Sequence, residues 1–313
     1  MTTHPIAISA EGPFSFRAAL GVFCRWSPIT RFAPEGTRVR LAFPLDGDFT
    51  PVAAELDGDE RGLRGRVAGA RPDAIARQLA RMFSLDGDAR DWPEVGARDA
   101  RLGRVMAALG YLRPVLFPSP YEAAAWAVLS QRISMEQAAR VQARLVGEHG
   151  VRLRAFGGEL RCFPPPDRLA RVTALGGLPR EKIDRLRGVA TAAEAGLLDA
   201  ARLRALGDVE APRALRAIRG IGAFWSQGIY LRACGVRDVF PDEPRALAAL
   251  GRLHGLGDRP PAAAVARLTA RWSPYRMWAC FLLRIAAGRE RYGQNVTSNA
   301  VSEGHACSPA ASS

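Results

Sequence analysis

The sequence LRAIRGIGAFWS, residues 215–226, has the pattern of a helix, a tight glycine turn and a second helix. Pro212 suits the first turn of the first helix, whose apolar residues fall on one side. Gly220 and Gly222 allow the backbone to turn with positive φ and leave bare N–H groups at the start of the second helix. A helix start of this kind binds anions, and phosphate is the anion that we expect here.

Composition predicts a helix-rich globular protein with a polyanionic partner. The 313 residues are 48% hydrophobic and carry a formal net charge of +13, which comes from arginine because Lys182 is the only lysine. Such a charge favours nucleic acid over a membrane surface as the partner. Since no run of 18 apolar residues and no signal-peptide core is present, we expect a cytoplasmic protein. The five cysteines and four histidines lack the spacing of metal ligands, so neither a zinc site nor an iron–sulfur cluster is expected.

Residues 1–114 have the mixed pattern of an α+β platform domain, a small antiparallel sheet with helices. Alternating apolar residues predict strands at residues 39–43, 52–56 and 63–67, with a turn at 57–59 between the last two. A short helix is expected within residues 14–24, and Asp73 is expected to cap another. We expect no chemistry in this domain.

Residues 115–290 have the pattern of an all-helical domain. Ser119 and Ser134 each begin a capping box, so one helix stops near residue 131 and the next runs from there to about Gly150. This abrupt meeting leaves Gln131 and Arg132 on an exposed corner, although many such corners are purely structural. Further helices are expected over residues 179–195, from the glycine turn to about 235, around 245–250, and through 283. Residues 291–313 have few bulky apolar side chains and are expected to be a disordered tail.

The order of these motifs resembles the helix-hairpin-helix DNA glycosylases, and among them the 3-methyladenine DNA glycosylase II family. Five stretches carry the resemblance over residues 115–285: AVLSQRIS (127–134), CFP (162–164), IRGIG (218–222), DVFP (238–241) and RWSPYR (271–276). The α+β region ahead of them also fits the family's layout. The resemblance implies an enzyme that grips a DNA phosphate, bends the duplex, rotates a damaged nucleotide outward and cleaves its glycosidic bond.

The resemblance also implies roles for two turns and for several aromatic residues. Arg132 stands where the family places the side chain that fills the gap left by the flipped base, next to Gln131. The expected DNA contacts of the hairpin are Arg219, Gly220, Ile221, Gly222 and Ala223, and the carbonyls of Arg219 and Ile221 are expected to hold a monovalent cation. Phe224 matches the ring that stacks on the flipped base, with Trp225, Tyr230, Trp272 and Trp278 as further pocket candidates. Core packing is the alternative for the last four, because helical aromatic residues usually pack inside.

A carboxylate at a helix N-terminus is the family's means of stabilising the positive charge on the sugar as the C–N bond breaks. Asp242 has the residue type that the family uses and suits the N-cap position. The spacing of apolar residues in the following helix fits the family better when it is counted from Glu243. An ungapped match to residues 238–241 would instead place Pro244 at the catalytic position. We expect Asp242 to be the catalytic residue, with Glu243 as the alternative. Asp238 is a third candidate, for which a structural role in the turn is the other interpretation.

The expected function is a monofunctional, monomeric DNA glycosylase that removes alkylated purines such as 3-methyladenine and leaves an abasic site. A lyase step needs an amine, and Phe224 stands where one branch of the superfamily carries its nucleophilic lysine. No cofactor other than the cation at the hairpin is expected. The alternative is a protein of glycosylase descent that binds bent or damaged DNA and cleaves nothing.

Overall fold

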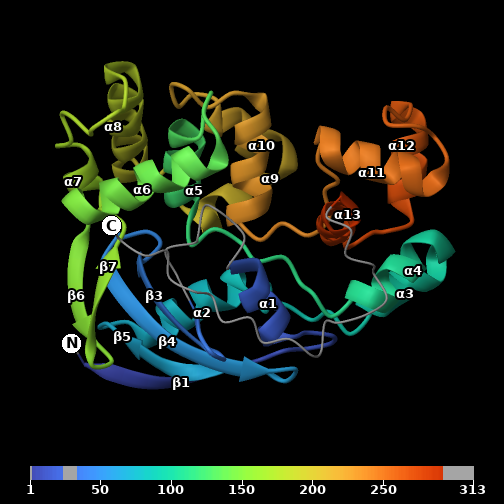
Figure 1. Cartoon of the computed structure of the whole chain (residues 1–313), viewed down its shortest axis with the longest axis horizontal. Coiled ribbons are helices and arrows are strands. Elements are labelled where there is room, and N and C mark those ends of the chain that lie inside the picture. The colour runs from blue at the N-terminus through green and yellow to red at the C-terminus, as the bar shows by residue number, and fades with distance from the viewer. Residues whose placement is uncertain (1, 24–33, 292–313) are drawn as a thin grey trace.

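The computed structural model describes residues 2–23 and 34–291 (Figure 1). Near the N-terminus, antiparallel strands form a sheet in the order β1-β5-β4-β3-β2. Their bounds are Thr3–Ser9 (β1), Pro34–Glu35 (β2), Arg38–Pro44 (β3), Pro51–Asp59 (β4) and Gly62–Ala68 (β5). The three predicted strands are confirmed as β3, β4 and β5.

The turn between β4 and β5 lies later than the sequence predicted. Pairing continues through Gly58↔Leu63 to Asp59↔Gly62, so the chain turns at residues 60–61 and not at 57–59. Within this pairing, position 58 has no room for a side chain, because a Cβ would lie 2.4 Å from the carbonyl oxygen of Gly62. Asp59 Oδ1 then accepts a hydrogen bond from the Arg61 N–H at 2.8 Å, which closes the turn.

Both faces of the sheet are covered, and the alternation along each strand sorts the side chains between them. One face presents large residues such as Leu41, Val52 and Val67 to α1 (Phe16–Phe23) and α2 (Pro72–Met82). The other presents alanines to a hairpin of β6 (Val151–Ala155) and β7 (Gly158–Cys162), which the sequence did not predict. In Figure 1 this hairpin runs from the sheet up to the helices above it.

The predicted helix starts are confirmed in part. Pro72 occupies the first turn of α2 and Arg71 its N-cap, so Asp73 lies inside the first turn and does not cap the helix. Ser119 caps α5 through the Glu122 N–H, and Ser134 forms the complete reciprocal capping box at α6. The helices of this region are α5 (Pro120–Leu129), α6 (Met135–His149), α7 (Pro166–Leu169), α8 (Arg180–Glu194), α9 (Ala200–Leu215) and α10 (Ala223–Ala233).

Besides the small cluster under the β6–β7 hairpin, two large apolar cores hold the described residues together. The second half of the chain returns to the first, because α11 (Pro244–His254) and α13 (Arg276–Arg291) pack with α4 (Ala100–Leu109) in the core of the sheet. Helix α3 (Trp92–Arg98) belongs to this core, and α12 (Ala262–Ala270) packs along it. The other core lies among α5 to α10, where α5 is buried along its whole length. The division at residue 114 stays a prediction, and the first core crosses it.

The fold class predicted from the sequence is confirmed: an antiparallel sheet with helices, followed by a helical region that contains a helix-hairpin-helix. No helix among the described residues is both long and apolar enough to cross a membrane. The predicted tail lies outside the described residues except for Arg291, the last residue of α13.

Candidate active site

The glycine hairpin, residues 219–222, joins α9 to α10 as predicted. Gly220 has a φ of +92°, and a Cβ there would lie 2.8 Å from the Cδ of Arg185, so both backbone conformation and space require glycine. Gly222 was expected to have a positive φ as well, but its φ is −86°. It is the N-cap of α10 and provides no side-chain cap, so the first N–H groups of that helix have no side-chain partner at the cap. Anions bind to such amides.

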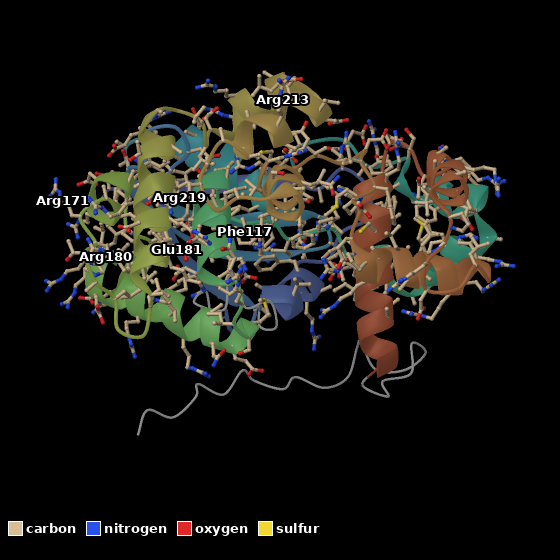
Figure 2. All side chains as sticks on the ribbon, turned by 90° about the horizontal axis from the view of Figure 1, so that it is seen from above. Phe117, Arg171, Arg180, Glu181, Arg213 and Arg219 are labelled. Atoms are coloured by element: carbon tan, nitrogen blue, oxygen red, sulfur yellow. The ribbon has the colours of Figure 1, made fainter. Side chains whose placement is uncertain are left out.

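Basic side chains are exposed around this hairpin. Arg219 precedes the first glycine, and Arg213 lies on the last turn of α9. Figure 2, the view from above, shows both of them together with Arg180 and Glu181 on the side of the molecule that carries α8, α9 and α10. This surface suits a polyanion.

The α5–α6 turn, residues 130–133, lies against the hairpin. Gln131 Nε2 donates a hydrogen bond to the carbonyl oxygen of Gly220 at 2.7 Å, which joins two segments 89 residues apart. Arg132 is exposed and has a φ of +59°, a left-handed conformation that is uncommon for a residue with a side chain. The structure thus brings together the two turns that the sequence singled out.

The candidate aromatic residues divide into two groups. Phe224, in the first turn of α10, is 56% exposed, and its ring contacts half-buried Trp225 edge-to-face at 5.5 Å between centroids. Trp272 is fully buried and donates from Nε1 to Asp99 Oδ2 at 2.9 Å. Trp278 is buried against the rings of Trp92 and Tyr275. Tyr230 is buried as well and donates to Asp208. Core packing, the alternative named for these residues, therefore describes Tyr230, Trp272 and Trp278, while Phe224 is the ring open to a ligand.

Asp238 is engaged within the turn that follows α10. It accepts hydrogen bonds from Arg276 Nε at 2.8 Å and from Ser273 Oγ at 2.7 Å. Partial burial raises the pKa of this carboxyl, but the bonds from Arg276 and Ser273 outweigh it and lower the pKa below the usual 3.8. The structural role considered for Asp238 is the one observed.

Glu243 is the N-cap of α11, which corrects the expectation that Asp242 suits this position better. The Glu243 carboxylate accepts from the Ala246 N–H at 2.8 Å, three residues on, with Pro244 in the first turn. The Glu243 side chain is 12% exposed, and its Oε2 lies 3.6 Å from Arg284 Nε. Asp242 is exposed, and its backbone N–H donates to Gln227 Oε1 at 3.1 Å. Because proline lacks an N–H, the helix begins at Pro244 and the residue before it becomes the cap.

Gln227 connects the acidic segment to the hairpin. It lies on α10 three residues after Phe224, so the two side chains are neighbours on one face of the helix. Gln131 makes the equivalent connection between the α5–α6 turn and Gly220. The sequence predicted Gly220 and Asp242, the residues to which these two glutamines are bonded. It did not predict Gln227, because no periodicity or motif marks a contact between separate elements.

Two relatives of known name are similar to this chain over most of its length. No model of a protein family matches the chain. A DNA-3-methyladenine glycosylase from Bacillus subtilis (strain 168) is 24% identical over 298 residues, which cover 90% of this chain and 98% of that protein. DNA-3-methyladenine glycosylase 2 from Escherichia coli (strain K12) is 33% identical over 252 residues, which cover 79% of this chain and 77% of the relative. The chain belongs to the DNA-3-methyladenine glycosylase family. This confirms the resemblance drawn from the five motifs.

Solved structures show that the fold, too, is that of the glycosylase family. The 3-methyladenine DNA glycosylase from Archaeoglobus fulgidus has a TM-score of 0.74 at 22% identity, and the match covers 90% of this chain and 98% of that one. MBOgg1 in complex with a low-affinity DNA ligand has a TM-score of 0.67 at 16% identity, covering 93% and 100%. Both likenesses extend over the sheet as well as the helical region.

Proposed function

We propose that this member of the family is a monofunctional DNA glycosylase that excises alkylated purines of the 3-methyladenine type. The observation that carries the proposal is the set of contacts from Arg132 through Gln131, the hairpin, α10 and Gln227 to the acidic segment at residues 242–243. A phosphate grip, an exposed ring and a carboxylate then belong to one continuous unit. Both relatives carry names that state glycosylase activity on 3-methyladenine.

Damaged duplex DNA is the substrate in this proposal. The N–H groups at the start of α10 would bind a phosphate oxygen, and Arg219 would add charge beside them. Arg132 would fill the place of a nucleotide that has rotated out of the stack. A structural neighbour, MBOgg1, was determined in complex with a DNA ligand, which supports DNA as the partner.

The reaction in this proposal is hydrolysis of the N-glycosidic bond. Water adds its oxygen to C1′ and releases one proton to solvent. The C1′–N bond breaks, and the base takes the electron pair of that bond, so a cationic alkylated purine leaves as the neutral base. A carboxylate beside C1′ stabilises the positive charge on the sugar, and alkylated purines suit this limited assistance because their own positive charge weakens the bond. The exposed ring of Phe224 would stack on such a cationic base.

Glu243 is the better supported of the two carboxylates. It is largely buried, it is held by the Ala246 N–H, and the positive end of the α11 dipole favours its negative charge. Asp242 remains the residue that the sequence favoured, but its exposure to solvent would weaken any charge–charge interaction with the sugar.

The monofunctional assignment is supported by the position of the single lysine. Lys182 Nζ donates to the carbonyl oxygens of Leu129 at 2.8 Å and Gln131 at 2.6 Å, so this amine is already engaged beneath the α5–α6 turn.

A monovalent cation at the hairpin would need backbone carbonyls as ligands, and the carbonyl of Gly220 already accepts a hydrogen bond from Gln131. The carbonyls of Arg219 and Ile221 therefore remain the ones proposed to hold a monovalent ion, which would add positive charge near the phosphate.

The test is release of methylated bases from alkylated duplex DNA, with borohydride added in a parallel reaction. We expect free 3-methyladenine, abasic sites in equal number, and no borohydride-trapped protein–DNA adduct. An adduct would contradict the monofunctional assignment. Binding to damaged duplex without release of any base would contradict the glycosylase proposal and favour the binding-only alternative.

A further inference from the structure

Two basic residues of α8 lie behind the DNA-facing turns and contact both of them. Lys182 and Arg185 are three residues apart, so their side chains project from the same face of the helix. Helix α8 packs against α5, whose last turn leads into the α5–α6 turn. The side chains of Lys182 and Arg185 are partly covered, in contrast to the exposed arginines near the hairpin.

Lys182 holds the end of α5. Its ammonium group donates to the carbonyl oxygens of Leu129, the last residue of α5, and of Gln131, in the turn that follows. A cation at a helix C-terminus satisfies free carbonyls and interacts favourably with the helix dipole. Partial burial and the neighbouring charge of Arg185 lower the pKa of Lys182, as expected for an ammonium group held away from solvent.

Arg185 connects the same turn to the hairpin. Its Nη1 donates to Gln131 Oε1 at 2.7 Å, while Gln131 Nε2 donates to the carbonyl oxygen of Gly220. Both ends of the Gln131 amide are therefore fixed. The stem of Arg185 also occupies the space that a side chain on Gly220 would need. Glu181, one turn earlier, pairs with the guanidinium and orients it.

Arg132 follows directly after this anchored residue, in the left-handed conformation that usually belongs to glycine at a helix end. A side chain held in such a conformation is strained, and residues of this kind cluster where function requires them. The surrounding contacts must impose the conformation. Those contacts are the ones that Lys182, Arg185 and Gln131 make.

We propose that Lys182 and Arg185 are positioning residues that clamp the α5–α6 turn to the glycine hairpin. The clamp presents Arg132 to the duplex at a fixed place relative to the phosphate held by the hairpin. This proposal rests on the proposed DNA-binding face and adds to it a source of rigidity. Neither positioning residue contacts DNA, and their effect on binding passes through Arg132.

The test is a double-mutant cycle read out as binding selectivity. Dissociation constants are measured by fluorescence anisotropy for a duplex that contains a tetrahydrofuran abasic analogue and for the undamaged duplex. The proteins are the wild type, Lys182→Met, Arg132→Ala and the double variant. We expect each single variant to lose selectivity for the abasic duplex, and Lys182→Met to have little further effect once Arg132 is absent. Residues that are linked through a shift of the backbone between them couple in this way, so the coupling should be about threefold or more.

Matched controls separate clamping from general destabilisation. Lys182→Arg keeps a cationic donor and should restore most of the selectivity, whereas Arg187→Met removes an exposed arginine from α8 without touching the turn and should leave selectivity unchanged. If Lys182→Met fails to fold, the cycle is run with Arg185→Met. The proposal is overturned if Arg132→Ala keeps wild-type selectivity, or if the clamp variant has the same effect in both backgrounds. Because binding is measured, a wild type that releases no base would refute the glycosylase proposal and leave this test intact.

Discussion

At the residue scale, two substitutions of Arg132 distinguish the contribution of its side chain to DNA selectivity from the strain of its left-handed backbone conformation. Arg132→Ala removes the side chain and keeps a Cβ at φ +59°, whereas Arg132→Gly removes both. We expect the glycine variant to be more stable than the alanine variant by about 1 kcal/mol, because the relief of strain exceeds glycine's extra entropy when unfolded. Urea unfolding measures the difference, and equal stabilities would contradict the strain. Selectivity for abasic DNA should fall equally in both.

The pair of Glu243 and Arg284 supplies a second prediction at this scale. The Arg284 guanidinium lies 3.6 Å from the carboxylate and offsets part of its charge. Arg284→Met should therefore raise the ratio of two excision rates, that of cationic N7-methylguanine over that of neutral hypoxanthine. The expected rise is up to about fivefold, which corresponds to the energy of a partly exposed ion pair. Single-turnover rates on the two duplexes give the ratio. Arg245→Met, on the exposed side of α11, is the matched control, and the same ratio in both variants would refute the assignment.

At the scale of elements, His254 is a largely buried histidine at the end of α11 opposite Glu243. Its Nε2 lies 3.4 Å from Asp99 Oδ2, and Asp99 caps α4 and binds Trp272. Burial lowers the pKa of His254 below its usual 6.5, an effect that Asp99 opposes and that Arg101 and Arg271 reinforce.

The consequence is a loss of stability at acidic pH. With a lowered pKa in the folded state, the unfolded chain binds a proton that the folded chain does not, so the free energy of unfolding falls as pH drops through 6.5. Urea unfolding from about pH 7.5 to about pH 5.5 should show a smaller fall for His254→Gln than for the wild type. An equal fall in both proteins would mean that His254 does not contribute.

Sequence patterns predicted elements well where one segment decides the outcome. The alternation in β3, β4 and β5 and the capping serine of α6 depend on neighbours a few residues away. The hairpin of β6 and β7 also carries alternating apolar residues and a Gly-Gly turn, but these short strands stand between helices and were missed. The cap of α11 was placed one residue early, since the proline that follows Glu243 decides where that helix begins.

The site was predictable only as a set of separate pieces. The hairpin and the α5–α6 turn were found from their own glycines and capping residues, but two hydrogen bonds between separate elements were not: Gln131 donates to Gly220, 89 residues away, and the Asp242 N–H donates to Gln227, 15 residues away. Similarly, the helical spacing of Trp272 and Trp278 fits a core position as well as a pocket position. Only the packing in the structure shows that both side chains belong to the core. Tertiary contacts carry this information, and periodicity does not.

At the scale of the whole molecule, the net charge of +13 makes DNA binding dependent on salt. Arg219→Gln should reduce the slope of log affinity against log salt by about 1, because one phosphate contact is lost. Arg104→Gln removes the same charge from the exposed side of α4 and should leave the slope unchanged. Anisotropy titrations of undamaged duplex from about 50 to about 200 mM salt measure both slopes. Equal slopes for the two variants would place the phosphate contacts away from the hairpin.

The most direct test of the whole account compares the two neighbouring carboxylates. Single-turnover excision of an alkylated purine is measured for the wild type, Glu243→Gln and Asp242→Asn, and binding to the abasic duplex is measured alongside. We predict that Glu243→Gln loses about 100-fold or more in rate while its binding persists, as expected for a group that stabilises transition-state charge. Asp242→Asn should stay close to the wild-type rate. A wild-type rate in Glu243→Gln would contradict the account.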